Sequence, residues 1–399
     1  MRSAERRLPA AALVAAALAC GGGGGGGSLP DTQRNVVPVS ADGALCGTNP
    51  GTYLNEPCVR VTVCTPGTQT CQTIDGILLD TGSFGLRIFK QALTVPLTPV
   101  TVAGRELAEC IQFGDLSADW GPVRTAGVVL GGEPQVQVPI QVIDATFPGR
   151  PTSCPNAEPD PATAGFNGIL GVGAAIQDCG GACTSSANVN VYYSCSGGSC
   201  GGTTVPLAQQ VTNPVAALPQ DNNGVVVKLP SVPAGGAPSA DGALLLGIDT
   251  AADNVAGSVT VLDLDDQLEF RTTLAGAQCS AFADTGSNAL FFAPPGGASL
   301  PACASNGDWF CPPTTTSFTA TNRGASGRGS AAVPFQVANF EQLDKGNAVF
   351  STLGGPALAA GAADCPAFDW GLPFFLGRAV YVGFEGMRSP LGVGPYVAH

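Results

Sequence analysis

The sequence predicts an all-β protein built from two similar lobes. The chain of 399 residues holds 55 Gly and 33 Pro, which break it into many short segments, and long helical periodicity is nearly absent. The tetrapeptide Asp-Thr-Gly-Ser occurs twice, at residues 80–83 and 284–287, and each copy follows a short apolar run. Because this length fits two domains of ordinary size, we expect one copy of the motif in each lobe.

Short alternating or apolar stretches predict the strands, which we expect at residues 59–63, 136–142, 225–229 and 259–264. Pro139 lies inside the second of these and implies a sheet edge or a break. Short helices are expected at residues 86–93 and 207–211. The segment between Cys64 and Cys71 is rich in turn residues, so we expect a tight turn closed by a disulfide between these two cysteines.

The repeated motif predicts a pair of cooperating carboxylates. One Asp can act as a general base on a water molecule while the other, protonated, polarises the carbonyl that the water attacks. Asp80 and Asp284 are therefore the candidate catalytic residues. The rest of each motif suits this role, because Gly permits a tight turn and the hydroxyl groups can bond the carboxylates. The expected supporting residues are Thr81, Gly82, Ser83, Thr285, Gly286 and Ser287.

Further segments resemble the pepsin-like aspartic proteases, and the resemblance extends from about residue 55 to the end of the sequence. Residues 166–173, Phe-Asn-Gly-Ile-Leu-Gly-Val-Gly, are similar to the apolar-apolar-Gly triplet that crosses beneath the first Asp loop in that family. Residues 374–378, Phe-Phe-Leu-Gly-Arg, are similar to the second triplet, and residues 242–249 to a turn between the lobes. The resemblance implies a bilobal fold and hydrolysis of peptide bonds.

The resemblance also implies a hairpin flap over the cleft, which we place at residues 112–122. The family carries a flap Tyr bonded to a Trp near the first motif, whereas this chain has Phe113 and Arg87 at the matching positions. Trp120 could supply an aromatic lid with an indole N–H donor, or it could be a packing residue. The flap candidates are therefore Phe113 and Trp120.

Other segments are similar to a narrower bacterial family that is catalogued only as a domain of unknown function. They are residues 120–123, 178–183, 211–215, 221–225 and 373–378. This second resemblance implies no activity, so the chemistry depends on the residues themselves.

The first 40 residues read as a targeting segment. Three Arg precede an apolar stretch that ends in Ala-Leu-Ala-Cys20, which resembles a bacterial lipoprotein signal; plain secretory cleavage nearby is the alternative. We expect a signal peptide at residues 1–19, lipid on Cys20, and a Gly-rich, loose tether through residue 40. The lobes would then span residues 41–250 and 251–399.

Cysteine usage indicates an exported protein. The chain has 15 Cys, so lipidation of Cys20 would leave 14, enough for seven disulfides in an oxidising compartment. A Cys-rich insertion at residues 178–202 holds four of them, for which disulfides are favoured over a zinc site. For the acidic residues 263–269 a solvated hairpin is favoured over a calcium site.

Composition excludes several functions. The formal net charge is −13 with only three Lys, so no basic surface for nucleic acid is expected. The single histidine is His399, expected at a frayed end, which argues against Ser-His-Asp, Cys-His or His-ligated zinc catalysis.

These observations together predict an aspartic endopeptidase that is anchored to the bacterial cell envelope by lipid, in the periplasm or at the outer surface. It would act as a monomer on peptide or protein substrates, without metal or cofactor. The alternative is a non-catalytic envelope lipoprotein that binds extended peptides in the same cleft.

Overall fold

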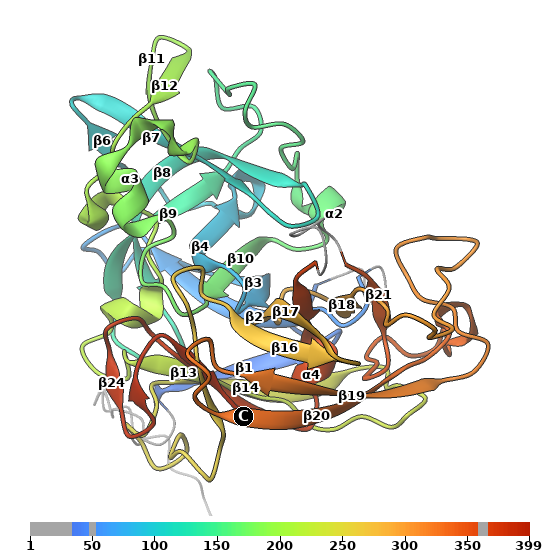
Figure 1. Cartoon of the computed structure of the whole chain (residues 1–399). Helices are drawn as coiled ribbons and strands as arrows, with labels where there is room; N and C mark the ends of the chain where they lie inside the picture. Colours follow the sequence, from blue (N-terminus) through green and yellow to red (C-terminus); the bar gives the residue numbers. More distant parts are fainter. Residues whose placement is uncertain (1–33, 48–52, 358–365) are drawn as a thin grey trace, which may run out of the picture.

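The computed structural model describes residues 34–47, 53–357 and 366–399, and within them the protein is all-β (Figure 1). Most strands belong to a 17-stranded sheet and a second, 7-stranded sheet. The predicted signal peptide, Cys20 and the glycine run lie outside the described residues. Within the described ranges the helical segments are short, among them α2 (Pro161–Ala164), α3 (Gly180–Ser185), α4 (Leu372–Phe375) and 3-10 turns at Lys90–Ala92, Ala187–Val189, Leu207–Gln209, Pro214–Ala217 and Phe340–Gln342.

The large sheet takes most of its strands from the first half of the chain. These are β2 (Pro57–Cys64), β3 (Cys71–Asp80), β4 (Phe84–Phe89), β5 (Thr98–Pro99), β6 (Thr101–Val102), β7 (Arg105–Gln112), β8 (Ala118–Val129), β9 (Val136–Ile143), β10 (Gly168–Val172), β11 (Tyr192–Ser196) and β12 (Ser199–Gly202). The alternating stretches at 59–63 and 136–142 form β2 and β9, as predicted. Residues 86–89, expected to begin a helix, instead lie in β4, because this stretch is buried on both of its faces.

A second part of the large sheet joins distant segments of the chain. It contains β1 (Val36–Ala41), β13 (Gly224–Lys228), β14 (Ala240–Leu246), β15 (Val261–Asp263), β23 (Ala379–Gly383) and β26 (Tyr396–Ala398). β1 pairs along its whole length with β14, so residues 36–40, expected in the loose tether, form a strand instead. β13 pairs with β23, and β15 with β26, so strands from beyond residue 250 complete the sheet of the first half.

The 7-stranded sheet comes entirely from the second half of the chain and lies at the lower right of Figure 1. Its strands are β16 (Phe270–Leu274), β17 (Ala277–Ala283), β18 (Leu290–Phe292), β19 (Thr316–Arg323), β20 (Ser330–Val337), β21 (Gly354–Pro356) and β22 (Phe368–Trp370). Stacked and edge-on aromatic rings fill its core, with Phe292 against Phe368 and Phe335 against Trp370. A separate hairpin is formed by β24 (Arg388–Ser389) and β25 (Gly392–Val393).

One three-strand arrangement occurs in both sheets. β10 lies between β3 and β4, parallel to the first and antiparallel to the second. β22 lies in the same way between β17 and β18. The chain therefore repeats not only a tetrapeptide but the strand unit around it.

The second triplet lies six residues before the position that the sequence suggested. Residues 374–378 do not cross beneath the second Asp loop, because Phe374 and Phe375 belong to α4. The strand in that place is β22, Phe-Asp-Trp, followed by Gly371. Its central Asp369 breaks the apolar pattern by which such a strand is recognised.

Disulfides hold the described cysteines. Each of the 13 cysteines in the described ranges is disulfide-bonded. Cys64 pairs with Cys71 as predicted. In the Cys-rich insertion Cys179 pairs with Cys183 and Cys195 with Cys200, which leaves no thiolate there for zinc. Three more pairs are Cys46–Cys58, Cys110–Cys154 and Cys303–Cys311.

The end of the chain is not frayed, contrary to expectation. The backbone of His399 exchanges hydrogen bonds of 3.2 and 3.0 Å with Thr260, and its ring packs edge-on against Phe374. Burial, with the nearby charge of Arg378, lowers the pKa of His399 to about 4, so the imidazole is neutral at pH 7.

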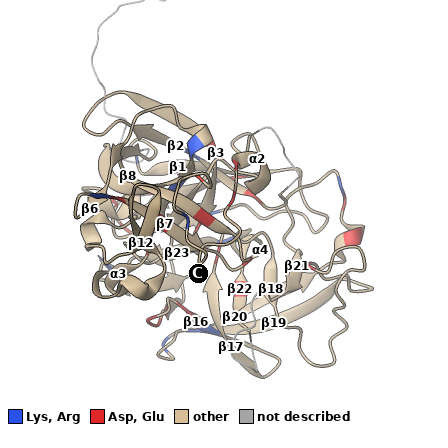
Figure 2. Ribbon diagram, turned by 90° about the horizontal axis from the view of Figure 1, so that it is seen from above, with Lys and Arg blue, Asp and Glu red and all other residues tan. Residues whose placement is uncertain are grey.

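Acidic and basic residues are scattered over the described chain rather than gathered on one face (Figure 2). The described residues contain no helix that is long and apolar enough to cross a membrane.

Candidate functional site

The two Asp-Thr-Gly-Ser motifs lie face to face, one from each repeated strand unit. Asp80 is the last residue of β3, and Asp284 directly follows β17. In the first unit the parallel strand β10 runs alongside β3, and its Gly171 lies opposite Asp80. The backbone N–H of Asp284 donates to the carbonyl of Trp370, 3.0 Å away, in the equivalent place. Rigid strands therefore fix both carboxylates.

Four hydrogen bonds join the two loops through Thr81 and Thr285. The N–H of Thr81 donates to the Thr285 hydroxyl at 3.1 Å, and the N–H of Thr285 donates to the Thr81 hydroxyl at 3.0 Å. Each hydroxyl in turn donates across the interface, from Thr81 to the carbonyl of Ala283 at 2.9 Å and from Thr285 to that of Leu79 at 2.7 Å. Both threonines are buried. The arrangement is reciprocal, so neither loop can move without breaking bonds of the other.

The Gly residues of the two motifs give the carboxyl groups room to approach. A Cβ atom on Gly82 would lie 2.5 Å from Cγ of Asp284, and one on Gly286 would lie 2.8 Å from Cγ of Asp80. The same Cβ position on Gly286 lies 2.8 Å from Oδ1 of Asp80 and 3.1 Å from Oδ1 of Asp284. The two Oδ1 atoms are therefore less than about 6 Å apart, within reach of a shared proton or one bridging water. Any larger residue at either Gly would push the carboxyl groups apart.

Each carboxyl group also receives hydrogen bonds from its own motif. Gly82 N–H donates to Oδ1 of Asp80 at 2.7 Å, and Gly286 N–H donates to Oδ1 of Asp284 at 2.7 Å. The Ser83 hydroxyl bonds Oδ2 of Asp80, and the Ser287 hydroxyl bonds Oδ2 of Asp284 at 2.9 Å. The six supporting residues that the sequence predicted are thus all in contact with the pair or with the opposite loop.

The two carboxyl groups are electrostatically coupled. Burial first, then the negative charges of Asp80 and Asp369, raise the pKa of Asp284 well above its ordinary value, and a hydrogen bond with Asp80 acts in the same direction. Two carboxylates this close cannot both ionise cheaply, so the pair retains one proton over a range of pH. One protonated and one ionised carboxyl is the state that general acid–base activation of water requires.

Two further residues at the site were missed from the sequence. Tyr53 donates a hydrogen bond of 2.8 Å from its hydroxyl to the carbonyl of Gly286. Burial, followed by the charge of Asp284, raises the pKa of Tyr53, so its phenol stays protonated. Asp369 is buried, and its Oδ2 lies 2.5 Å from the hydroxyl of Ser287. Nothing in its own neighbourhood marks Tyr53, whereas the Phe-Asp-Trp-Gly sequence around Asp369 could have been found as a second triplet.

The hairpin predicted as a flap is formed by β7 and β8. Phe113 is half-buried at its turn, where its N–H donates to the carbonyl of Ser117 at 3.0 Å. Leu116, at the same turn, is 73% exposed. Trp120 packs the interior of the hairpin instead of covering the Asp pair, because it is fully buried, stacks edge-on against Tyr193 and donates its indole N–H to the carbonyl of Phe147 at 2.9 Å.

Arg87 has a role of its own, unrelated to a flap. Its Nη2 lies 3.1 Å from Oε1 of Glu109 and 2.9 Å from Oδ2 of Asp178, and all three side chains are buried. Burial lowers the pKa of Arg87, but the charges of Glu109 and Asp178 more than offset this, and the pKa is raised. Asp178 also accepts from the Tyr192 hydroxyl at 2.6 Å. The cluster therefore ties the start of the Cys-rich insertion to β4 and β7.

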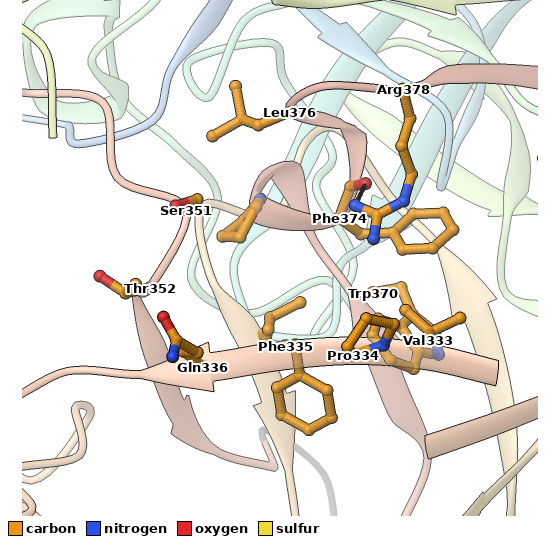
Figure 3. Close-up of a pocket in the computed structure, with 12 residues that line it drawn as sticks. Val333, Pro334, Phe335, Gln336, Ser351, Thr352, Trp370, Phe374, Leu376 and Arg378 are labelled. Carbon is orange, nitrogen blue, oxygen red and sulfur yellow. Dashed lines mark hydrogen bonds between the residues drawn. The ribbon is translucent and has the colours of Figure 1, made fainter. Parts of the chain in front are cut away.

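Two cavities flank the site without containing the Asp pair. One, of about 240 Å³, is lined by Thr81, Gly82, Ala283 and Leu268 among others, and so lies against the base of both loops. The other, of about 200 Å³, lies between β20 and the segment after β22. Figure 3 shows the guanidinium of Arg378 beside the ring of Phe374 there, 4.9 Å from its centroid.

The described ranges contain two clusters of side chains that could in principle bind a metal ion, but the cysteines in both are oxidised. Two clusters of suitable side chains occur, Cys46 with Glu56 and Cys58, and Cys303 with Cys311 and Glu341. The cysteines of both clusters are joined in disulfides, which removes the thiolates that a metal would need.

Comparison with known proteins gives a family but no activity. A family model with the description "Protein of unknown function (DUF3443)" matches residues 31–399. The chain belongs to this family. No curated protein matches the sequence. The match covers both Asp motifs and both repeated strand units, so the site described above lies wholly within the family region.

Proposed function

We propose that this member of the DUF3443 family is an aspartic endopeptidase with a pepsin-like arrangement of two lobes. The observation that carries the proposal is the pair of carboxyl groups, Asp80 and Asp284, held opposite each other by reciprocal threonine hydrogen bonds. A buried pair that shares one proton has both of the functions that peptide hydrolysis needs. The ionised member takes a proton from water, and the protonated member donates to the carbonyl oxygen.

The repeated strand unit supports the same proposal. A carboxylate from each of two equivalent units gives a site with approximate twofold symmetry, to which an extended peptide can bind across both halves. The phenol of Tyr53 places a hydroxyl beside the second Asp loop. Phe113 of the hairpin has no hydroxyl. We propose that Tyr53, rather than a hairpin tyrosine, contacts the bound chain.

A non-catalytic peptide-binding protein is the second candidate. The observation that favours it is the hairpin, whose turn carries Phe113 and whose Trp120 is buried in the interior, so neither supplies a hydroxyl to the Asp pair. In that case the same cleft would hold extended peptides without cleaving them.

The disulfides indicate the kind of compartment in which the protein is found. Paired cysteines form in oxidising compartments, so we propose that the protein is exported and, with Cys20 as lipid attachment site, held at the bacterial envelope. Globomycin-sensitive processing and lipid labelling that is lost in Cys20→Ser would test the anchor.

The decisive experiment incubates the purified mature protein with a mixed peptide library from about pH 3 to about pH 7, a range that includes the pH at which such a carboxyl pair loses its shared proton. Cleavage that is blocked by a statine-type transition-state mimic and is absent in Asp80→Asn supports the peptidase. Peptide binding without cleavage supports the binding protein. Cleavage that persists in Asp80→Asn overturns the proposed mechanism.

A further inference from the structure

Asp369 breaks the symmetry of the two strand units. In the first unit Ile169 lies opposite Leu78, two residues before Asp80, and is buried. In the second unit Asp369 lies opposite Phe282, two residues before Asp284. A carboxyl group therefore takes the place of an aliphatic side chain directly beneath one of the two Asp loops.

The hydroxyl of Ser287 lies between two carboxyl groups. Its Oγ is 2.9 Å from Oδ2 of Asp284 and 2.5 Å from Oδ2 of Asp369. A hydroxyl carries one hydrogen, so it can donate to only one of these oxygens. The other contact is a hydrogen bond only if that carboxyl is protonated and donates to Ser287. The geometry thus requires a proton on one of these two carboxyl groups.

The surroundings of Asp369 place that proton on it. Its strand neighbours are Phe282 on β17 and Phe291 on β18, which offer no charge. The charged groups that face it come from the two loops, Asp80 and Asp284, and both oppose its ionisation, while the protonated Tyr53 contacts the same loop. Its Oδ1 has no hydrogen-bond partner in the described structure. An ionised carboxylate buried in this way would be uncompensated.

We propose that Asp369 is a positioning residue that stays protonated, donates to Ser287, and so fixes the Ser287 hydroxyl as a donor to Asp284. Within the described part of the chain the hydroxyl of Ser83 bonds Asp80 and no second carboxyl group. The relay therefore makes the two carboxyl groups unequal. Asp284 receives a directed hydrogen bond that favours its ionised form and partly offsets the burial and the neighbouring charges that raise its pKa. This effect on catalysis rests on the proposed peptidase function, but the protonation of Asp369 does not.

The first test measures protonation without any substrate. The mature protein is labelled with ¹³C-carboxyl aspartate, and the infrared band of a protonated carboxyl is followed with rising pH. We expect a band that persists at neutral pH, is lost in Asp369→Asn, and shifts in Ser287→Ala but not in the matched Ser83→Ala. A spectrum of wild-type protein without a protonated carboxyl at neutral pH would overturn the proposal, whether or not any variant folds.

The second test uses stability and activity together. A carboxyl whose folded pKa is raised loses stability as pH rises above its unfolded value of about 4, so the Tm of wild type should fall relative to Asp369→Asn over that range. Equal Tm differences at every pH would contradict the proposal. If the protein cleaves peptides, Asp369→Asn, which keeps a donor to Ser287, should keep the cleavage pH profile. Asp369→Ile, the residue of the first unit, should move the profile to higher pH. If wild type cleaves nothing, the peptidase proposal fails and the infrared and Tm results still decide the role of Asp369.

Discussion

Thr81 and Thr285 each donate a backbone N–H to the other's hydroxyl, at 3.1 and 3.0 Å, across the junction of the two strand units. Each hydroxyl then passes its own hydrogen to a carbonyl of the opposite unit. The two loops are therefore one hydrogen-bonded body. The separation of the carboxyl groups is set by this body and not by the carboxyl groups themselves, which repel when both are charged.

Replacement of Thr81 by Val should destabilise the protein and loosen the pair. Valine keeps the shape but leaves the buried N–H of Thr285 without an acceptor, which costs about 1–3 kcal/mol. Chemical denaturation measures the loss. Thr62→Val, which removes one hydroxyl of the surface pair Thr62–Thr73, is the matched control and should change stability by much less. Equal effects of the two substitutions would show that the cross-loop bonds contribute little.

Asp80→Asn and Asp284→Asn should each abolish peptide cleavage. Loss of one member of an acid–base pair typically reduces the rate by about 10²–10⁴-fold. Turnover of a fluorogenic peptide is the measurement. Asp75→Asn, on the surface beside Arg60, is the control and should cleave normally.

Asp284→Asn should also make the protein more resistant to unfolding at neutral pH. The pKa of Asp284 is raised in the folded state, so its contribution to stability is present at low pH and is lost as pH rises through the folded pKa. The asparagine variant cannot ionise at this position, so it does not lose stability in this way as the pH rises. Its Tm should therefore exceed that of wild type by a margin that grows with pH, and a margin that shrinks would refute the raised pKa of Asp284.

Tyr53→Phe should lower cleavage more than stability. The ring and its packing remain, and only the hydrogen bond to the Gly286 carbonyl is lost, which is worth about 1 kcal/mol. Steady-state kinetics should show a reduced kcat/KM. Tyr193→Phe, whose hydroxyl contacts Ser153 in the other part of the structure, serves as control. Unchanged kinetics in Tyr53→Phe would remove this phenol from the proposed site.

Arg87→Met should be among the most destabilising single changes. It leaves the buried Glu109 and Asp178 without their cation, and breaking a buried ion pair costs about 3–5 kcal/mol. Adding Glu109→Gln and Asp178→Asn to the same chain should restore much of the loss. Arg60→Met, in an exposed pair with Asp75, should cost less than about 1 kcal/mol in the same denaturation experiment.

The sequence was sufficient to predict the all-β class, the strands with clear alternation and the two Asp loops, because these signals are local. The prediction failed for a strand that is buried on both faces and therefore shows no alternation of apolar and polar residues. The stretch Leu86–Phe89 is buried on both faces, and such a run cannot be told from a helix by its period. It also failed at the second triplet, because the apolar residues 374–377 matched the expected pattern better than Phe-Asp-Trp-Gly does.

Side-chain partners were beyond the sequence for a different reason. The sequence marks Arg87 only as a residue at the position of the family's Trp, and the packing of β7 and of the Cys-rich insertion brings Glu109 and Asp178 to it. Tyr53 reaches Gly286 across 233 positions of sequence. Contacts of this range depend on the assembled sheets, which no local pattern encodes.

The pairing of β13 with β23 has a consequence for how the protein is made. Residues 379–383 are needed to cover the open side of β13, so the large sheet cannot be finished while the ribosome is still adding the second half of the chain. The growing polypeptide carries unsatisfied backbone groups along residues 224–228 until residues 379–383 have emerged. An exposed strand edge of this kind is a template for pairing with other chains. Cutting the chain before Ala379 should therefore yield protein that aggregates rather than a smaller working unit.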